Sequence, residues 1–383
     1  MKTYIKLVLF LTIAMSIFNQ TSYALDKIKI GLIVPLTGEN HLIGKRIIKS
    51  IRMAVNKIDD NKIEIIPKDT KSNPIDALKV SKELYKDGVK IIIGPVFNES
   101  TKYLDDLKEV TFISFTNKLI DNPKNVISAG VNATSQLQTI KKFMKKKNLS
   151  KIIFLIPRSE FKNEIEEAIN KTKINYKEVF YYDREPTKLT KQIEHLTNYQ
   201  IRKNNLKEEI KRIESLSFQN KEKKIQILKK KDTLGDISFD SVMIADFDEN
   251  LKSVATSLLY TDVSSERVSY ITLNQWFDES LLRETSLHPI YFPSINKKNY
   301  ELFMSDFRDN YGQDGDQLSF LSYDLFGLVY FLIYKNDFKI SKNIFYKKNK
   351  FKGKIGFFEI NKNTITHQLN FYSIENNKFK KIF

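Results

Sequence analysis

The stretch IKIGLIVPLTG, residues 28–38, decides the fold class of this chain. Its first seven residues are apolar or glycine except for Lys29, which is typical of a buried β-strand, and Pro35 and Gly38 end that strand. Apolar residues then recur at helical spacing, namely Ile47, Ile51, Ala54, Val55 and Ile58. A buried strand that leads through a turn into an amphipathic helix predicts the opening of a βαβ unit.

The same alternation continues along the chain. In the first part it predicts strands at 63–66, 89–95 and 111–115, with helices at 76–86 and 101–108. It restarts after a break near Gly130 with helices at 136–147 and 160–172 and strands at 151–157 and 176–182. Further strands are predicted at 238–245, 268–273, 291–292, 354–360 and 369–374, and a largely apolar helix at 318–334.

This pattern predicts an α/β protein with two Rossmann-like lobes, parallel sheets and a cleft between the lobes. The expected organisation is a signal peptide at 1–24, a first lobe of 25–135 plus 274–340, and a second lobe of 136–273 plus 341–383. The chain is expected to cross between the lobes near 131–135, near 272–275 and between 336 and 342.

A long charged segment, 187–232, is expected as an insertion in the second lobe. Residues 189–231 contain neither Gly nor Pro and are rich in Lys, Glu, Ile and Leu. The Leu and Ile residues recur three and four apart, which predicts long amphipathic helices. A turn near 215–220 would split them into a hairpin.

The N-terminus has the pattern of an export signal. Lys2 and Lys6 precede an apolar run at 7–18, and Ala24 ends a Ser-Tyr-Ala sequence suited to cleavage. About a dozen apolar residues are too few to span a bilayer, although an uncleaved anchor stays open as the alternative. We expect cleavage after Ala24, a periplasmic protein that starts at Leu25, and no stable membrane insertion. The lack of cysteine excludes a lipid anchor on a cysteine.

The composition fits a globular protein of two domains without disulfides. Cleavage would leave roughly 359 of the 383 residues, with no cysteine, 41% hydrophobic and 12% aromatic residues in the whole chain. The formal charge of +17 would by itself indicate nucleic acid. Because Lys is accompanied everywhere by Ile and Asn, we interpret it as a compositional bias, and nucleic acid does not fit an exported protein. An anionic partner in the cell envelope stays open.

Patterns that carry catalysis or metal binding are absent from the sequence. The four histidines, His41, His195, His288 and His367, show no ligand spacing. There is no G-x-S-x-G motif, and the spacing from Gly38 to Gly44 does not fit a phosphate-binding loop. We therefore expect a protein that is not an enzyme and holds no cofactor or metal.

The chain resembles the type I periplasmic binding proteins of the leucine-binding family, which include ABC solute-binding receptors. The motifs that carry this resemblance span nearly the whole mature chain: residues 30–38, 69–70, 73–74, 91–95, 322–324 and 353–358. Three further stretches resemble the penicillin-binding protein activator branch of that family: 112–117, 232–242 with the charged helices before it, and the Asn-Gln-Trp motif at 274–276.

The resemblance also implies where a ligand would bind. In amino-acid receptors of the family, a Ser after the third strand and a Thr after the fourth bind the ligand carboxylate, and an acidic residue of the second lobe binds its ammonium. The implied cleft residues of this chain are Asn98, Glu99, Ser100, Ser114, Thr116 and Asn117 in the first lobe and Arg158 and Phe161 in the second. Asn98 lies where the family has Ser, and Glu99 would repel an anionic ligand group. Arg158 is expected to approach Glu99 or a bound anion.

Two functions are consistent with the sequence. In the first, the protein regulates peptidoglycan synthesis through contact with a peptidoglycan synthase, a penicillin-binding protein. In the second, it delivers an amino-acid-like or other small polar ligand to an ABC permease.

Overall fold

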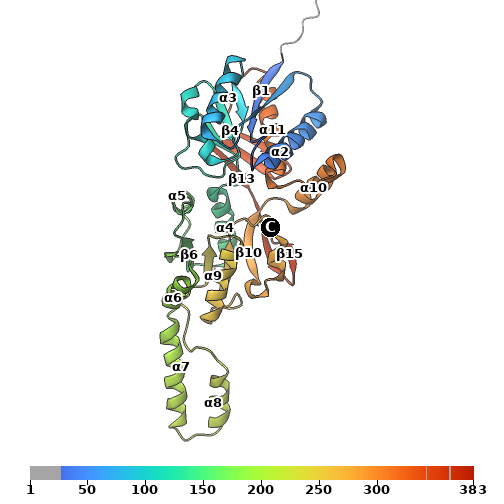
Figure 1. The fold of residues 1–383 in the computed structure, drawn as a ribbon. Helices are drawn as coiled ribbons and strands as arrows, with labels where there is room; N and C mark the ends of the chain where they lie inside the picture. The colour runs from blue at the N-terminus through green and yellow to red at the C-terminus, as the bar shows by residue number, and fades with distance from the viewer. Residues whose placement is uncertain (1–26, 342, 362–363) are drawn as a thin grey trace, which may run out of the picture.

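The structure is a computed structural model that describes residues 27–341, 343–361 and 364–383. The expected signal peptide, 1–24, lies outside the described residues. Figure 1 shows two α/β lobes, one above the other, and a pair of helices that projects from the far end of the second lobe.

The first lobe is built on a parallel sheet of five strands in the order β2-β1-β3-β4-β5. The strands are β1 (Ile28–Val34), β2 (Ile63–Asp69), β3 (Ile91–Ile93), β4 (Thr111–Ser114) and β5 (Val126–Ser128). Side chains alternate between its two faces, so that Leu32 packs in one core cluster with α2 (His41–Ile58). Ile33 packs in another cluster with Leu84 of α3 (Pro74–Lys86). The four strands and two of the three helices predicted at this end of the chain are confirmed, whereas β5 was not predicted.

The second lobe is built on a mixed sheet of seven strands in the order β15-β14-β10-β9-β8-β6-β7. Its parallel strands are β6 (Ile152–Pro157), β7 (Glu178–Tyr182), β8 (Ser241–Ile244), β9 (Ser269–Thr272) and β10 (Ile290–Ser294). The strands β14 (Asn370–Glu375) and β15 (Lys378–Lys381) extend it antiparallel. Helices α4 (Ala133–Lys147), α5 (Lys162–Thr172) and α9 (Asp248–Tyr260) bury apolar side chains in the cores on its faces.

One strand lies in the other lobe from the one predicted. The sequence pattern assigns 274–340 to the first lobe, but β10 pairs in parallel with β9, where Ile290 lies beside Tyr270. The assignment of β10 to the first lobe is therefore wrong, because its pairing with β9 keeps the chain in the sheet of the second lobe. The second crossing therefore follows β10, before α10 (Lys297–Tyr311), whose Tyr311 hydroxyl donates to the Lys49 carbonyl of the first lobe.

The segment before β14 also differs from its predicted place. Strands β11 (Asn349–Lys352), β12 (Phe357–Asn361) and β13 (Thr364–Gln368) form a separate antiparallel sheet. Phe351 of this sheet packs on Phe331 of α11 (Gln317–Lys335), with ring centroids 5.6 Å apart. Because that contact holds the sheet against the first lobe, the assignment of all of 341–383 to the second lobe is wrong. The last crossing lies between β13 and β14, whereas the first lies between β5 and α4 as predicted.

The helix predicted at 101–108 is replaced by two 3₁₀ turns, η1 (Asn98–Thr101) and η2 (Leu104–Leu107). Leu104 and Leu107 are both buried, and their spacing of three residues matches the repeat of a 3₁₀ turn.

Helix α11 lies in the core of the first lobe. By length and composition it is the one helix in the described ranges that could cross a membrane, and 61% of it is buried inside the protein. Ser50 of α2 donates to the Ser319 carbonyl of α11 at 2.5 Å, and Phe303 of α10 packs on Phe320. Through these contacts the apolar helix α11 packs against both α2 and α10.

The predicted insertion consists of three helices, α6 (Pro186–Leu196), α7 (Tyr199–Glu214) and α8 (Lys221–Lys229). Leu189 and Ile193 of α6 are buried in the core of the second lobe. Helices α7 and α8 form the hairpin that projects in Figure 1, with its turn at 215–220 as predicted.

Candidate functional site

The first-lobe residues that were predicted to face the cleft lie at the carboxyl ends of two neighbouring strands. Asn98, Glu99 and Ser100 are in η1, just after β3, whereas Ser114 ends β4 and Thr116 and Asn117 follow it. Strands β3 and β4 pair in parallel, so their ends meet at one edge of the sheet.

Two of the three hydroxyl groups of this set are used within the first lobe. Ser114 is fully buried and donates through Oγ to the Pro95 carbonyl at 2.8 Å. Thr116 Oγ1 lies 3.5 Å from Asn98 Oδ1 and accepts from the Lys118 N–H at 3.2 Å. Ser100 is also buried, whereas Glu99 and Asn117 are exposed. The two hydroxyls at the end of β4 are therefore held by the protein itself.

The second-lobe residues of the prediction do not meet the first set. Arg158 lies 3.8 Å from Asp183 across an ion pair and sits over the Tyr181 ring. Phe161 is half-buried against the core of the second lobe. Arg158 is paired inside its own lobe, so its expected approach to Glu99 or to a bound anion stays a prediction.

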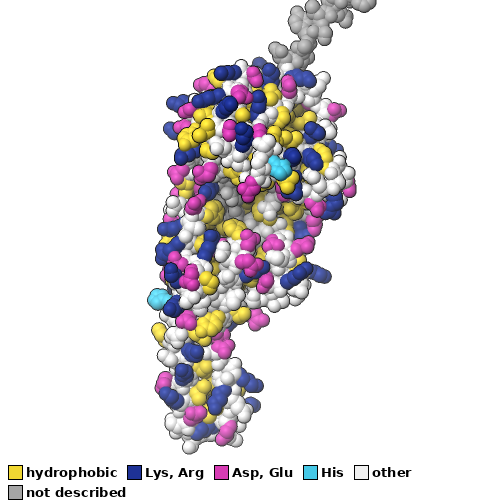
Figure 2. All heavy atoms as spheres, in the orientation of Figure 1, with side chains coloured by type: hydrophobic (Ala, Val, Ile, Leu, Met, Phe, Trp, Pro, Cys, Tyr) yellow, Lys and Arg dark blue, Asp and Glu magenta, His cyan; other side chains and the backbone are white. Residues whose placement is uncertain are grey.

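A cavity of about 450 Å³ lies between the lobes, where Figure 2 shows the surface hollowed. It is lined by the ends of β4, β8 and β9, by the β5–α4 crossing and by the start of α11: Asn117, Val131, Gln136, Phe247, Asp248, Asn274, Gln275, Trp276, Asp278 and Gln317. Of the eight predicted residues, Asn117 is the one that lines this cavity.

The missed residues carried a signal in the sequence. The Asn-Gln-Trp motif at 274–276 follows a predicted strand, so it had to lie at the same sheet edge as the end of β8. The backbone there is unusual, because Trp276, Phe277 and Asp248 all have φ between 50° and 61°. Such left-handed conformations cost energy in residues other than glycine and gather at functional sites.

The acidic residue at the end of β8 is neutralised within the second lobe. Asp246 is buried and accepts from Arg184 through both oxygens, at 2.9 and 3.0 Å. It also accepts from the Tyr182 hydroxyl at 2.8 Å, and burial together with this carboxylate raises the pKa of Tyr182. A carboxylate with these partners is not free to bind a ligand ammonium.

A buried carboxylate joins the two lobes beside the cleft. Glu164 of α5, 5% exposed, accepts from the backbone N–H groups of Leu119 and Ile120 in the loop after β4. Lys118 of the same loop lies 3.7 Å from Glu160 of the second lobe. These contacts hold the lobes in their present relation on this side.

The crossing on the other side is tied together by buried polar groups. Asn132 donates through Nδ2 to the Ile365 carbonyl of β13 at 2.9 Å, and Ser135 Oγ accepts from the His367 N–H. His367 Nε2 lies 2.9 Å from the Ala129 carbonyl. Burial lowers the pKa of His367 to about 4, so the ring is neutral at neutral pH.

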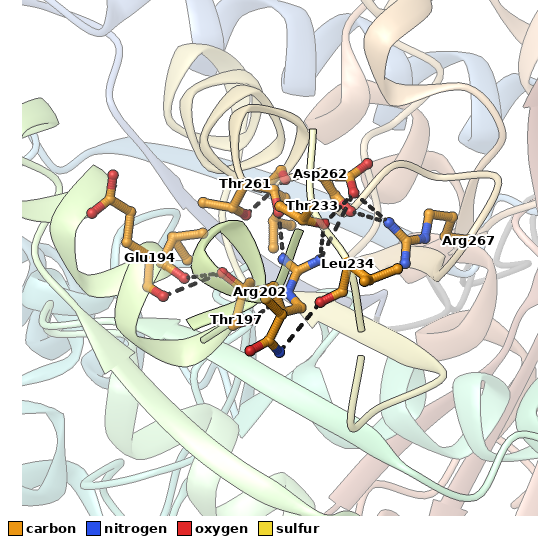
Figure 3. Close-up of polar contacts among 11 residues, drawn as sticks. Glu194, Thr197, Arg202, Thr233, Leu234, Thr261, Asp262 and Arg267 are labelled. Carbon is orange, nitrogen blue, oxygen red and sulfur yellow. Dashed lines mark hydrogen bonds and ion pairs between the residues drawn. The ribbon is translucent and has the colours of Figure 1, made fainter. Parts of the chain in front are cut away.

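The base of the projecting hairpin is fixed by Arg202, as Figure 3 shows. This arginine is 3% exposed and donates to the Thr197 carbonyl, Thr233 Oγ1 and the Thr261 carbonyl. Thr233 in turn donates to Asp262, which also pairs with Arg267. The network joins the start of α7, the segment after α8 and the end of α9.

Beyond this base the hairpin packs on itself. Leu206 and Ile213 of α7 and Leu228 of α8 form a small separate core. Leu216, Phe218 and Ile227 are exposed apolar residues on its outer part. Residues 199–231 carry eleven Lys and Arg against four Asp and Glu, and Figure 2 shows these charges interspersed on the surface.

Within the described ranges, no group of three or more His, Asp or Glu side chains is placed to hold a metal ion.

Comparison with known proteins agrees with this geometry. The periplasmic binding protein family profile matches residues 27–173. A comparison by sequence with curated proteins gives no match.

Solved structures of two kinds share the fold. The C-domain of LpoA from Haemophilus influenzae, a regulator of PBP1A, is 11% identical, and the match covers 93% of this chain and 100% of that one with a TM-score of 0.63. LivJ from Streptococcus pneumoniae, a branched-chain amino acid transporter substrate-binding protein in complex with isoleucine, is 17% identical over 92% and 98% of the chains, with a TM-score of 0.54. An ABC transporter substrate-binding protein from Desulfitobacterium hafniense in complex with Leu is 12% identical over 93% and 100%, with a TM-score of 0.60.

Two lobes with sheets of mainly parallel strands and a cavity between them identify the fold: the chain has the type I periplasmic binding protein fold, and its residues 27–173, which run from the first lobe into the second, match the periplasmic binding protein family.

Proposed function

We propose that the protein is an exported, non-enzymatic regulator of peptidoglycan synthesis that binds a peptidoglycan synthase. The observation that carries this proposal is the α7–α8 hairpin, which has its own small core and projects away from the two-lobe body. Because the buried Arg202 holds its base, the hairpin is a fixed projection with a defined orientation. Solute capture between two lobes does not require such a projection.

The hairpin offers chemistry suited to a partner surface. Exposed Leu216 and Phe218 lie at its turn, and the net charge of residues 199–231 is +7 by the count above. Charges of one sign steer an oppositely charged partner, whereas exposed apolar side chains supply contact area. The fold shared with the LpoA C-domain, a regulator of PBP1A, supports the same proposal.

The test removes the hairpin but keeps the residues that anchor its base. Residues 206–228 are replaced by a short Gly-Ser linker, so that Arg202 and Thr233 remain. We expect the variant to fold with an unchanged body and to lose pull-down of the synthase. A matched control reverses the charge of two lysines away from the hairpin, Lys142→Glu and Lys145→Glu in α4. This variant should keep the interaction. A folded deletion variant that still binds the synthase would refute the proposal.

An ABC permease receptor is the second candidate, and the cavity of about 450 Å³ between the lobes favours it. A thermal-shift screen with amino acids, small peptides and muropeptides separates the two candidates, because a ligand that binds the folded state raises its melting temperature. Tight binding of an amino acid would favour the receptor.

A further inference from the structure

A groove lies along one side of α11 in the first lobe, away from the cavity between the lobes. Helices α2, α10 and α11 lie together in this lobe (Figure 1), and all three, with β11, line the groove of about 580 Å³. Gln317, at the start of α11, lines the cavity between the lobes, whereas the groove begins at Tyr323 and runs to Tyr334. These residues span about 16 Å of helix, so the groove is an elongated and separate site.

The floor of the groove is apolar, although the exposed face of a surface helix is normally polar. It consists of five residues that recur three and four apart on one face of α11: Tyr323, Gly327, Tyr330, Phe331 and Tyr334. Four of them are half-buried, and Tyr334 is 60% exposed. An exposed apolar surface of this kind marks a binding site.

The walls of the groove are apolar on three sides. Ile58 of α2 forms one wall, and Leu302 of α10, which is 53% exposed, forms another at the Tyr323 end. Phe351 of β11 forms the third. It approaches α11 closely because Gly327 has no side chain, since a Cβ there would lie 3.3 Å from the Phe351 ring.

The charged residues of the groove itself are already engaged. Asp324 is the one acidic residue among the described lining residues, and its carboxylate is buried and accepts from two backbone N–H groups after β11. Lys354 pairs with Asp306 at 3.3 Å. Lys352 lies over the ring of Phe357, which is not part of the groove. The groove itself therefore offers a ligand mainly apolar surface.

Beside Tyr334, the groove adjoins a basic pocket. This pocket of about 220 Å³ is lined by Lys335, Lys347 and Lys348, and no Asp or Glu is among the described residues that line it. Lys335 connects the two sites, because its Nζ lies 5.6 Å from the ring centroid of Phe331 in the floor of the groove. Three cations with no carboxylate beside them in the pocket attract an anion.

We propose that the groove binds a long-chain fatty-acid carboxylate, with the hydrocarbon chain along α11 and the carboxylate at Lys335, Lys347 and Lys348. An unbranched hydrocarbon chain suits an elongated groove with an apolar floor and walls, and each methylene removed from water strengthens binding. The lysines at one end fix the direction of the ligand, because a carboxylate at the Leu302 end would lie among apolar side chains. This inference goes beyond the proposed function and requires no synthase.

The test titrates the full mature protein with dodecanoate, below the concentration at which it forms micelles, and follows calorimetric heat and melting temperature. We expect saturation at a one-to-one ratio and a higher melting temperature. Octanoate, whose hydrocarbon chain is shorter, should bind at least about a hundredfold more weakly, because each buried methylene is worth about fourfold in affinity. Dodecyltrimethylammonium has the same hydrocarbon chain with a cationic head and should bind at least about tenfold more weakly than dodecanoate.

Variants at exposed positions then locate the site. Leu302→Ser should weaken dodecanoate by about tenfold, whereas Leu42→Ser, at a residue of α2 that is 54% exposed and outside the groove, should leave the affinity unchanged. Lys335→Glu should also weaken dodecanoate by about tenfold without weakening dodecyltrimethylammonium, and Lys142→Glu on α4 is its control.

Three results would overturn the proposal: no saturation at a one-to-one ratio, equal affinity for the anionic and cationic heads, or an affinity for dodecanoate that stays unchanged in both Leu302→Ser and Lys335→Glu. Since no synthase is present in these titrations, none of these results bears on the regulator proposal, which has its own test.

Discussion

Glu164, in the second lobe, accepts a hydrogen bond from the backbone N–H of Leu119, in the first lobe, at 2.9 Å. The same oxygen accepts from the Ile120 N–H at 2.8 Å. Hydrogen bonds to a carboxylate are stronger than those between neutral groups. Together with the Lys118–Glu160 ion pair, this side chain links the two lobes away from the chain crossings.

We predict that Glu164→Ala loosens the lobes. It leaves two backbone donors without their acceptor, and the unfolding free energy should fall by about 1–3 kcal/mol. Small-angle X-ray scattering should show a larger radius of gyration. Glu164→Gln is the matched control, because both N–H groups donate to one oxygen that glutamine retains, so it should stay close to the wild type. Equal scattering curves for wild type and Glu164→Ala would contradict this role.

Much of the fold could be predicted because its strands are short apolar runs bounded by turn residues. β1, β6 and β8 each lie within a predicted stretch, and so does the turn between α7 and α8. The lobe that a late strand joins could not be predicted in this way. β10 is an apolar run, and nothing in its sequence specifies which of the two sheets it joins. Its pairing with β9 and β14 assigns it to the sheet of the second lobe.

The site could be predicted less well than the fold. Strand order brings Asn98 and Thr116 to one edge, as the resemblance implied, and their side chains contact each other there. Which hydroxyl is already satisfied depends on distances that a sequence does not contain. The cavity lies instead beside Trp276, where the motif was visible but its neighbours, Gln136 of the same lobe and Gln317 across the cleft, were not.

The base of the hairpin gives a second prediction. Arg202→Met removes three hydrogen bonds at a buried site and leaves their acceptors unpaired, so it should cost about 3–5 kcal/mol. Amide hydrogen exchange should rise in α7 and α8 before it rises in β6 or β8. Arg212→Met is the control, because Arg212 lies on the same helix but is exposed and pairs only across one turn with Glu209. Similar losses of unfolding free energy in both variants would show that Arg202 does not anchor the base of the hairpin.

The buried His367 predicts a pH dependence. Its folded pKa of about 4 lies below the ordinary 6.5, so the unfolded state takes up the proton first. Stability is therefore lost as the pH falls from about 6.5 to about 4, by at most about 3 kcal/mol. Burial raises the pKa of Asp324 to about 6, so this carboxyl works in the opposite direction over the same range.

A comparison of two proteins separates these effects. His367→Gln removes the titrating ring and keeps a side-chain donor for the Ala129 carbonyl, while Asp324 is common to both proteins. Urea unfolding at pH 7, 5.5 and 4.5 should show the wild type losing more stability toward acid than the variant. Parallel pH profiles would mean that His367 is not kept neutral by the fold.

The internal bonds of Thr116 give the last prediction, which bears on the choice between regulator and receptor. Its hydroxyl accepts from the Lys118 N–H and contacts Asn98, so Thr116→Val should cost about 1 kcal/mol of stability. Because this hydroxyl is held inside the first lobe and Asp246 is clamped by Arg184, leucine and isoleucine should not raise the melting temperature of the wild type. Thr190→Val on the exposed face of α6 is the control for the change of side chain. Tight binding of leucine by the wild type, lost in Thr116→Val and kept in Thr190→Val, would show that the hydroxyl turns to a ligand and would favour the permease receptor over the regulator.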